Sequence, residues 1–170
     1  MLEDVAKAIK TALETDLEAA LDVVEARWTA AGDSLTLPDP ESYLLGYQPT
    51  VVEKAQSEFP VMVITAMEER PGPASDQWGY GEGQVTATVY WFVAAANEDD
   101  CNRMAWRYGE AIDVVIRDHE RLDKGITVEA YVPTTRVSFV AREMPDLGAS
   151  DEGFYTQMGE KTWLINVRHG

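Results

Sequence analysis

Carboxylates are the commonest side chains in this sequence that could take part in chemistry. The chain holds 30 Asp and Glu against 14 Lys and Arg, and its formal net charge at pH 7 is -16. Two carboxylates that converge in an apolar pocket can act as a general acid and a general base, because such surroundings move their pKa values apart. The sequence alone does not show which carboxylates converge, so a carboxylate enzyme stays as an alternative hypothesis.

Metal-binding patterns are weak in this chain. The two histidines, His119 and His169, have no His or Cys at ligand spacing, which argues against a transition-metal site. Glu98, Asp99 and Asp100 form an acidic run, but this run lacks the loop spacing of a calcium site. A helix start explains the run, because negative charge is favourable at the N-terminus of a helix. We therefore expect neither a metal nor another cofactor.

Nucleophilic and phosphate-binding patterns are also missing from the sequence. Cys101 is the single cysteine, and its place on the apolar face of a predicted helix favours a small buried hydrophobe over a reactive thiol. The serines lack the flanking glycines of a nucleophile elbow. Gly79, Gly81 and Gly83 alternate, yet Glu82 stands among them without the lysine and the helix of a phosphate-binding loop. These residues predict a protein that is not an enzyme.

Two large aromatic residues lie in a polar stretch, residues 68–83. This stretch is rich in Gly and Pro, and we interpret it as a long, mobile hairpin connection. Large aromatic side chains supply much of the binding energy at protein interfaces, so Trp78 and Tyr80 are predicted to contact a partner. The alternative is that both side chains fold back onto the sheet.

The elements that must position these residues are organised around the stretch from Gln84 to Gly125. Alternating β-branched, small and aromatic residues predict a strand over residues 85–96, covered on both faces. Asn97 then caps a helix over residues 98–121, and Gly125 ends it. Apolar residues recur in this helix at three- and four-residue steps, and Trp91, Tyr108, Ile112 and Ile116 are expected in the core. The charged residues of the helix are expected on its wet face: Arg103, Arg107, Glu110, Asp113 and Arg117.

A long amphipathic helix is predicted at the N-terminus. Its apolar stripe spans residues 2–28, ends before Gly32, and would be about 39 Å long at 1.5 Å per residue. This length exceeds the width of a compact domain of 170 residues, so part of the stripe is expected to rest on a neighbouring subunit. Residues 33–56 are interpreted as an irregular connector. Further strands are predicted at residues 59–67, 126–132, 137–141 and 162–167.

The order of these elements predicts an α+β fold. A mostly antiparallel β-sheet would carry the long N-terminal helix and the central helix, both packed on one face. The chain has 170 residues, of which 45% are apolar, so we expect one core and a single domain over residues 1–170. No stretch approaches the roughly 20 apolar residues of a membrane span, which predicts a soluble protein.

This order of features resembles the tail terminator and related tail-completion proteins of long-tailed bacteriophages. The resemblance rests on the N-terminal helix, the FPVMV strand entry at residues 59–63, the Gly/Pro-rich hairpin, the central strand and helix, the Gly125 stop and two closing strands. It covers nearly the whole chain. It lies in element order and residue character and includes no catalytic signature.

The resemblance implies a structural virion protein that forms a ring, usually hexameric, at the head-proximal end of the tail tube. Such a ring ends polymerisation of the tube and provides the head-tail joining surface. Its partners would be copies of itself, the tail tube protein and the head-completion or connector proteins, with no membrane involved. The protein would be located in the virion, at the tail or neck, and in the host cytoplasm during assembly.

Strong acidity agrees with a ring whose pore DNA crosses without specific binding, because a negative wall repels phosphates. Acidic residues of the loop 143–153 are expected to line this channel: Glu143, Asp146, Asp151 and Glu152. Solubility alone is the other explanation of the charge. Two further hypotheses stay open, a head-completion or connector protein of the phage neck, and a small acidic binding protein that mimics DNA charge and belongs to no virion.

Overall fold

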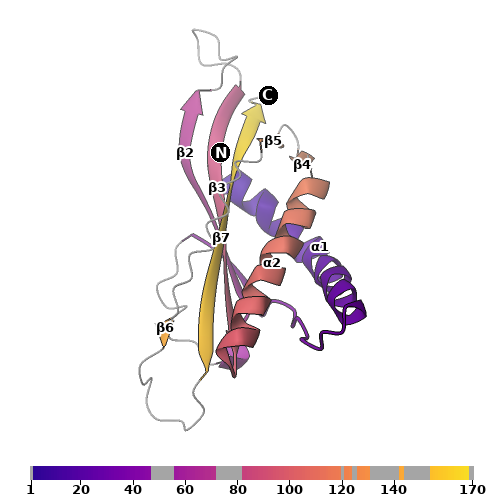
Figure 1. Cartoon of the computed structure of the whole chain (residues 1–170). Coiled ribbons are helices and arrows are strands. Elements are labelled where there is room, and N and C mark those ends of the chain that lie inside the picture. The colour runs from indigo at the N-terminus through magenta and orange to yellow at the C-terminus, as the bar shows by residue number, and fades with distance from the viewer. Residues whose placement is uncertain are drawn as a thin grey trace.

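One sheet with both long helices on the same face makes up the architecture (Figure 1). The computed structural model describes residues 2–46, 56–71, 82–119, 121–123, 126–130, 142–143 and 154–168. Within these residues, two α-helices and a mostly antiparallel sheet form an α+β fold. The predicted fold class, with the N-terminal and central helices packed on one face of the sheet, is confirmed.

Strand order in the sheet departs from the order along the chain. Seven strands among the described residues are arranged as β1-β2-β3-β7-β5-β4, and β6 also pairs with β7. All pairs are antiparallel except β1 with β2. The elements are α1 (Leu2–Ala30), β1 (Ser42–Leu45), the short 3-10 helix η2 (Gln56–Glu58), β2 (Val61–Pro71), β3 (Glu82–Ala95), α2 (Glu98–Asp118), β4 (Arg121–Asp123), β5 (Ile126–Ala130), β6 (Arg142–Glu143) and β7 (Tyr155–Arg168).

Helix α1 confirms the predicted N-terminal helix and ends close to where the sequence places its end. Gly32 follows it with a φ of 91°, a conformation that glycine adopts without strain. The apolar stripe from Val5 to Val24 is buried inside the chain's own core. The stripe is therefore covered within the chain as far as Val24, and the expected contact of its remaining part with a neighbouring subunit stays a prediction. The physical reason is that α2 and strands β1 to β4 together supply enough apolar surface to cover the buried part.

Helix α2 begins as predicted and ends earlier than predicted. The Asn97 side chain accepts a hydrogen bond from the backbone N–H of Asp100 at 2.8 Å, which caps the first turn. The last bond of the helix runs from the N–H of His119 to the carbonyl of Val115 at 3.1 Å. The predicted end at Gly125 is wrong, because residues 121–123 already form β4 and pair with β5. Gly125 itself lies outside the described residues.

The core lies between the helices and the alternate residues of β3 that face them. Trp91 and Tyr108, with Ile112 and Ile116 of α2, are buried there as predicted. The Trp91 indole donates a hydrogen bond to the carbonyl of Ala105 in α2 at 2.8 Å, which ties the sheet to the helix. The opposite face of the sheet carries a smaller apolar cluster in which the Tyr90 and Phe92 side chains are half-buried: Phe59, Val61 and Val63, with Leu44, Tyr90, Phe92, Ala94 and Phe154.

The strands extend further than their hydrophobic patterns predicted. β2 and β3 stay paired as far as Pro71 opposite Gly83, so both ends of the stretch 68–83 are strand and not loop. β7 begins at Tyr155, seven residues before the predicted closing strand, and pairs with β3 along its whole length. Backbone hydrogen bonds between neighbouring strands drive this extension and do not depend on alternating side chains.

The connector over residues 33–56 contains a strand that was not predicted. β1 pairs in parallel with β2, with Tyr43 beside Met62 and Leu44 beside Val63. The interpretation of this segment as wholly irregular is therefore wrong, because the short apolar run Tyr43 to Leu45 can pair at the edge that β2 offers. β5 confirms the strand predicted at residues 126–132 as far as Ala130, and residues 137–141 lie outside the described residues.

Candidate functional site

Most residues predicted to bind a partner or to line a channel lie outside the described residues: Trp78, Tyr80, Asp146, Asp151 and Glu152. Glu143 belongs to β6 and pairs with Tyr155 through the backbone, and its side chain lies outside the described part of the structure. The partner-contact residues and the channel-lining acids therefore stay predictions. The described residues bring other side chains together, on the helical layer.

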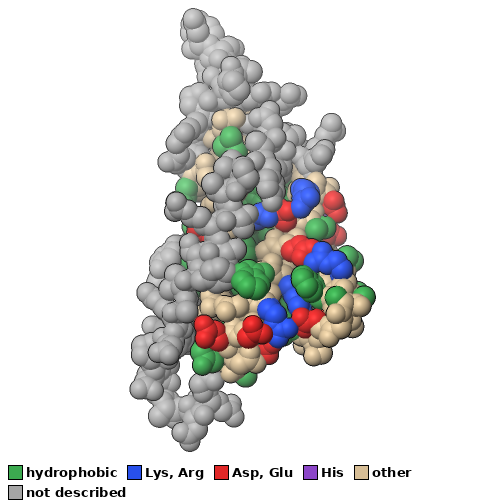
Figure 2. All heavy atoms as spheres, in the orientation of Figure 1, with side chains coloured by type: hydrophobic (Ala, Val, Ile, Leu, Met, Phe, Trp, Pro, Cys, Tyr) green, Lys and Arg blue, Asp and Glu red, His purple; other side chains and the backbone are tan. Residues whose placement is uncertain are grey.

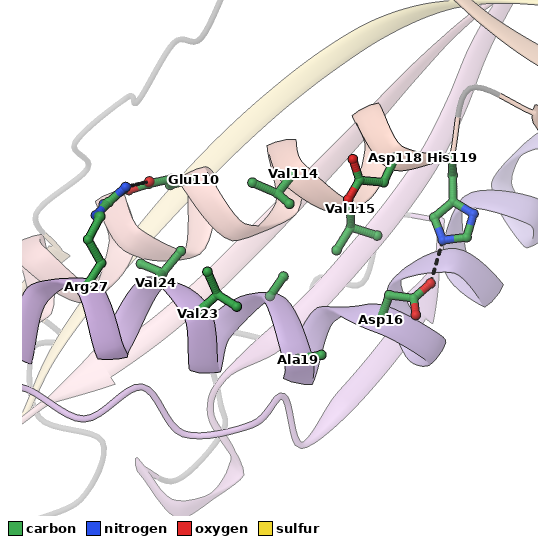
Figure 3. Close-up of a pocket in the computed structure, with 11 residues that line it drawn as sticks. Asp16, Ala19, Val23, Val24, Arg27, Glu110, Val114, Val115, Asp118 and His119 are labelled. Carbon is green, nitrogen blue, oxygen red and sulfur yellow. Dashed lines mark hydrogen bonds and ion pairs between the residues drawn. The ribbon is translucent and has the colours of Figure 1, made fainter.

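A groove of about 570 Å³ runs between α1 and α2 (Figure 3). We call it the interhelical groove. It is lined by Asp16, Ala19, Ala20, Val23, Val24 and Arg27 of α1, and by Glu110, Val114, Val115, Asp118 and His119 of α2 and its C-cap.

Apolar side chains form the middle of the interhelical groove. Val23 is 70% exposed and Val114 is 38% exposed, although both are large hydrophobic residues. Ala19 and Ala20 are small, so they leave room between the helices beside these valines. A sequence signal for this surface existed, because Val23 stands outside the buried stripe of α1 and Val114 stands among the charged residues of α2. That signal alone does not distinguish the two valines from the many other apolar residues of both helices.

Arg27 and Glu110 form an ion pair at one end of the interhelical groove, and His119 and Asp16 form a hydrogen bond at the other end (Figure 3). Arg27 donates to both carboxylate oxygens of Glu110, with Nη2 to Oε2 at 2.5 Å. At the other end, His119 Nε2 lies 2.5 Å from Asp16 Oδ2. Both pairs are partly exposed, so they position the rims of the groove and add little to stability.

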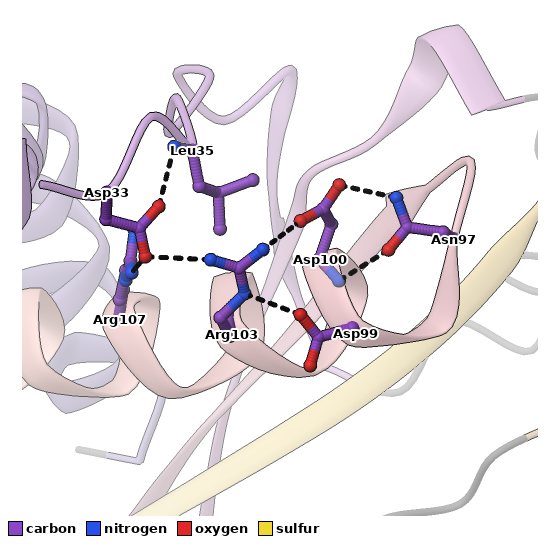
Figure 4. Close-up of polar contacts among 7 residues, drawn as sticks. All are labelled: Asp33, Leu35, Asn97, Asp99, Asp100, Arg103 and Arg107. Atoms are coloured by element: carbon purple, nitrogen blue, oxygen red, sulfur yellow. Dashed lines mark hydrogen bonds and ion pairs between the residues drawn. The ribbon is translucent and has the colours of Figure 1, made fainter.

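Beside the Arg27 end, Asp33 holds the chain after α1 against α2 (Figure 4). Its carboxylate accepts hydrogen bonds from the N–H of Leu35 at 2.9 Å and from Arg103 Nη1 at 2.7 Å, and it also pairs with Arg107. Arg103 in turn reaches Asp99 in the first turn of α2, with 3.0 Å between Nε and Oδ2. Asp99 and Arg103 stand four residues apart, a spacing at which an α-helix brings opposite charges together.

Arg107 was predicted on the wet face of α2, and that prediction is wrong. The residue is only 3% exposed, and its guanidinium lies over the Trp28 ring at 4.7 Å from the ring centroid. Pairing with Asp33 and stacking on Trp28 stabilise the buried charge. A recess of about 180 Å³ lies between the exposed Trp106 and these residues, and it meets the interhelical groove at Glu110, which lines both.

Asp113 was also predicted on the wet face, and it too is buried. Its Oδ1 lies 2.6 Å from Nζ of Lys161 on β7, and both side chains are buried beneath α2. Asp113 also pairs with Arg117, four residues further along the helix. Helix periodicity misplaced Asp113 because its partner comes from a strand that lies far away in the sequence.

Cys101 confirms its predicted place in the core. It is fully buried, and its thiol lies 3.3 Å from the carbonyl of Tyr155. Burial raises the pKa of this thiol to about 11, so the thiolate needed for nucleophilic chemistry is scarce at neutral pH. Among the described residues, no three His, Cys, Asp or Glu side chains gather as metal ligands would.

The outer surface of the helical layer carries both signs of charge. Figure 2 shows acidic and basic side chains close together over this part of the molecule, with hydrophobic side chains between them. None of the described helices combines the length and the hydrophobicity that crossing a membrane requires. No protein-family model matches the chain, and no curated protein matches it in sequence.

Stability at acid pH provides a test of the Asp33 contacts. The hydrogen bond from Leu35 and those from Arg107 and Arg103 lower the pKa of Asp33 from 3.8 to about 2. A carboxylate with a lowered pKa in the folded state stabilises the protein above the unfolded pKa and loses this effect as pH falls towards the folded pKa. We expect Asp33→Asn to lower the Tm at pH 7, and the difference from wild type to shrink between about pH 4 and pH 2.

Thermal unfolding measured from pH 7 to pH 2 checks this expectation. Asp22→Asn, at an exposed position of α1, is the matched control, and its Tm should follow that of wild type throughout. A Tm difference for Asp33→Asn that stays constant down to pH 2 would contradict the role given to the Asp33 carboxylate.

Proposed function

We propose that this chain is a structural virion protein that forms a ring at the head-proximal end of a phage tail tube. There it ends tube polymerisation and provides the head-tail joining surface. The order of elements supports the proposal. A long N-terminal helix, the β2–β3 hairpin, α2 and the closing strands follow one another in the order on which the resemblance to tail-completion proteins rests. The protein would act without catalysis and without a cofactor, in the virion and, during assembly, in the host cytoplasm.

The observation that most supports a ring is that the sheet ends in two different edge strands. In the described part of the chain, β1 stands at one end of the strand order and β4 at the other. Edge strands present backbone N–H and C=O groups that can pair with another chain. A repeated contact between two unlike surfaces closes into a ring when its rotation allows, whereas a like-with-like contact gives a two-fold dimer. We place β1 of one subunit beside β4 of the next.

Such a strand contact is short, because β1 has four residues and β4 has three. Side chains around the edges must therefore add to it, and Trp78 and Tyr80 are proposed to do so at a neighbouring subunit or at the tail tube. Glu143, Asp146, Asp151 and Glu152 are proposed to face the channel, where negative charge keeps DNA from binding. The tube protein and the head-completion or connector proteins would be the other partners.

Cross-linking tests the ring, and the chain is suited to it because its single cysteine, Cys101, is buried. We expect the double variant Leu45→Cys/Leu122→Cys, whose two positions face the helical side of the sheet, to give a ladder of covalent oligomers that stops at the ring size when treated with a short bismaleimide. Each single variant is a control, because a contact between unlike edges cannot join two copies of one edge. Native mass spectrometry with and without tail tubes should show the same largest species.

Other outcomes of this experiment separate the alternatives. Single variants that cross-link into dimers would indicate a like-with-like contact and contradict the ring. A chain that remains a monomer or dimer on its own and with tubes would favour the acidic binding protein. A ring that forms but binds neck particles instead of tube ends would favour the head-completion or connector protein.

A further inference from the structure

The interhelical groove exposes more apolar surface than its surroundings explain. Val23, at 70%, is the most exposed large hydrophobic residue among those described, and Val114 faces the same groove. The polar side chains at the end of the groove do not cover the valines, because Arg27 and Glu110 bind each other. Covering the valines with another apolar surface would be favourable.

The shape of this surface fits a helix. The recess next to Trp106 continues the groove at Glu110. The hollowed surface therefore extends along α2 from Trp106 to Asp118. These residues span about 18 Å of helix axis at 1.5 Å per residue, which matches a partner helix of about three turns. Ala19 and Ala20 are small and leave room for a third helix to pack between the first two, in the way that amphipathic helices enter apolar grooves.

The charge of the surface indicates the chemistry of the partner. Three carboxylates line the interhelical groove, Asp16, Glu110 and Asp118, together with Arg27 and His119. Glu110 binds Arg27 and Asp16 binds His119, so Asp118 is the carboxylate of the rim that a basic partner can reach. The chain as a whole carries a formal net charge of -16 at pH 7. A second copy would bring the same negative charge, whereas a helix with Lys and Arg beside its apolar stripe would be attracted and could reach Asp118 at the rim.

We propose that the interhelical groove is a docking site for a basic amphipathic helix of another protein. The apolar stripe of that helix packs on Val23 and Val114, and a basic residue beside the stripe pairs with Asp118. Trp106, 53% accessible, extends the exposed apolar surface beyond the end of the groove. This site lies on the helical layer and does not depend on the sheet edges that form the proposed ring.

A labelled synthetic peptide tests the proposal against the whole chain. The probe is a helix of about four turns with leucine at three- and four-residue steps and lysine at the flanking positions, and fluorescence anisotropy measures its binding. We expect Val23→Glu to weaken binding about tenfold, because it places a charge in the apolar contact. Asp118→Lys should weaken it as well, and added salt should do the same by screening.

Two controls make the result specific. Met67→Glu changes another exposed apolar residue, 55% accessible and on β2 in the sheet, and it should leave the affinity within about twofold of wild type. A second peptide, with glutamate in place of every lysine, should not bind. Circular dichroism should show unchanged folding for both glutamate variants, since both sites are exposed.

Several outcomes would overturn the proposal. They are absence of binding by the lysine peptide at millimolar concentration, equal binding of the glutamate peptide, and equal weakening by Val23→Glu and Met67→Glu. A dimer of the free chain that Val23→Glu dissociates would assign the groove to a second copy instead.

Discussion

Asp113→Leu is expected to destabilise the protein by about 3–5 kcal/mol, because it leaves the buried ammonium of Lys161 without its carboxylate. The two groups lie 2.6 Å apart, and both side chains are less than a tenth exposed beneath α2. At such a site water replaces little of the lost attraction, so the cost of the buried charge is felt. Urea unfolding followed by circular dichroism measures the change in the free energy of unfolding.

A double-mutant cycle separates the ion pair from simple packing at this position. Lys161→Met alone should cost less, because Asp113 keeps Arg117 as a partner and Arg117 reaches solvent. Asp113→Leu/Lys161→Met should recover most of the loss, since two apolar side chains of similar size replace the pair. Additive costs in the double variant, or a cost below about 0.5 kcal/mol for Asp113→Leu, would show that the pair is not a buried unit.

Gly159→Ala is expected to cost about 3 kcal/mol, the upper part of the usual range for an overpacked core. A Cβ atom at Gly159 would lie 2.0 Å from Cε2 and 2.1 Å from Cζ2 of Trp91. The indole cannot move away easily, because it donates to the Ala105 carbonyl and Gly109 of α2 closes on its other side. Trp91 thus occupies a slot between β7 and α2 that exists only because both positions are glycine.

Two further variants test this slot. Gly109→Ala should cost less than Gly159→Ala, since its Cβ would lie 2.9 Å from Cζ2 and alanine favours a helix by about 1 kcal/mol over glycine. Adding Trp91→Phe to Gly159→Ala should give a smaller total loss than the two single losses together, because the smaller ring vacates the contested space. Strict additivity of these two changes, measured by urea unfolding, would contradict the steric explanation.

Local patterns in the sequence determined the elements and the fold class. The apolar repeat of α1 and α2 follows from 3.6 residues per turn, and the start of α2 follows from the capping chemistry of Asn97. Alternation along β3 predicted that Trp91 is buried. These features depend on residues that are close in sequence, so they can be predicted without knowledge of any contact between distant segments.

Only the tertiary structure decided which charges are buried, where the strands pair and where a groove remains. Arg107 and Asp113 look like surface residues in the helix pattern, and they are buried because Asp33 and Lys161 come from distant segments to pair with them. β1 exists because β2 offers it an edge. The interhelical groove depends on how α1 packs against α2 at Ala19 and Ala20. Each of these features is a pairwise contact across the fold, and periodicity along one segment holds no information about it.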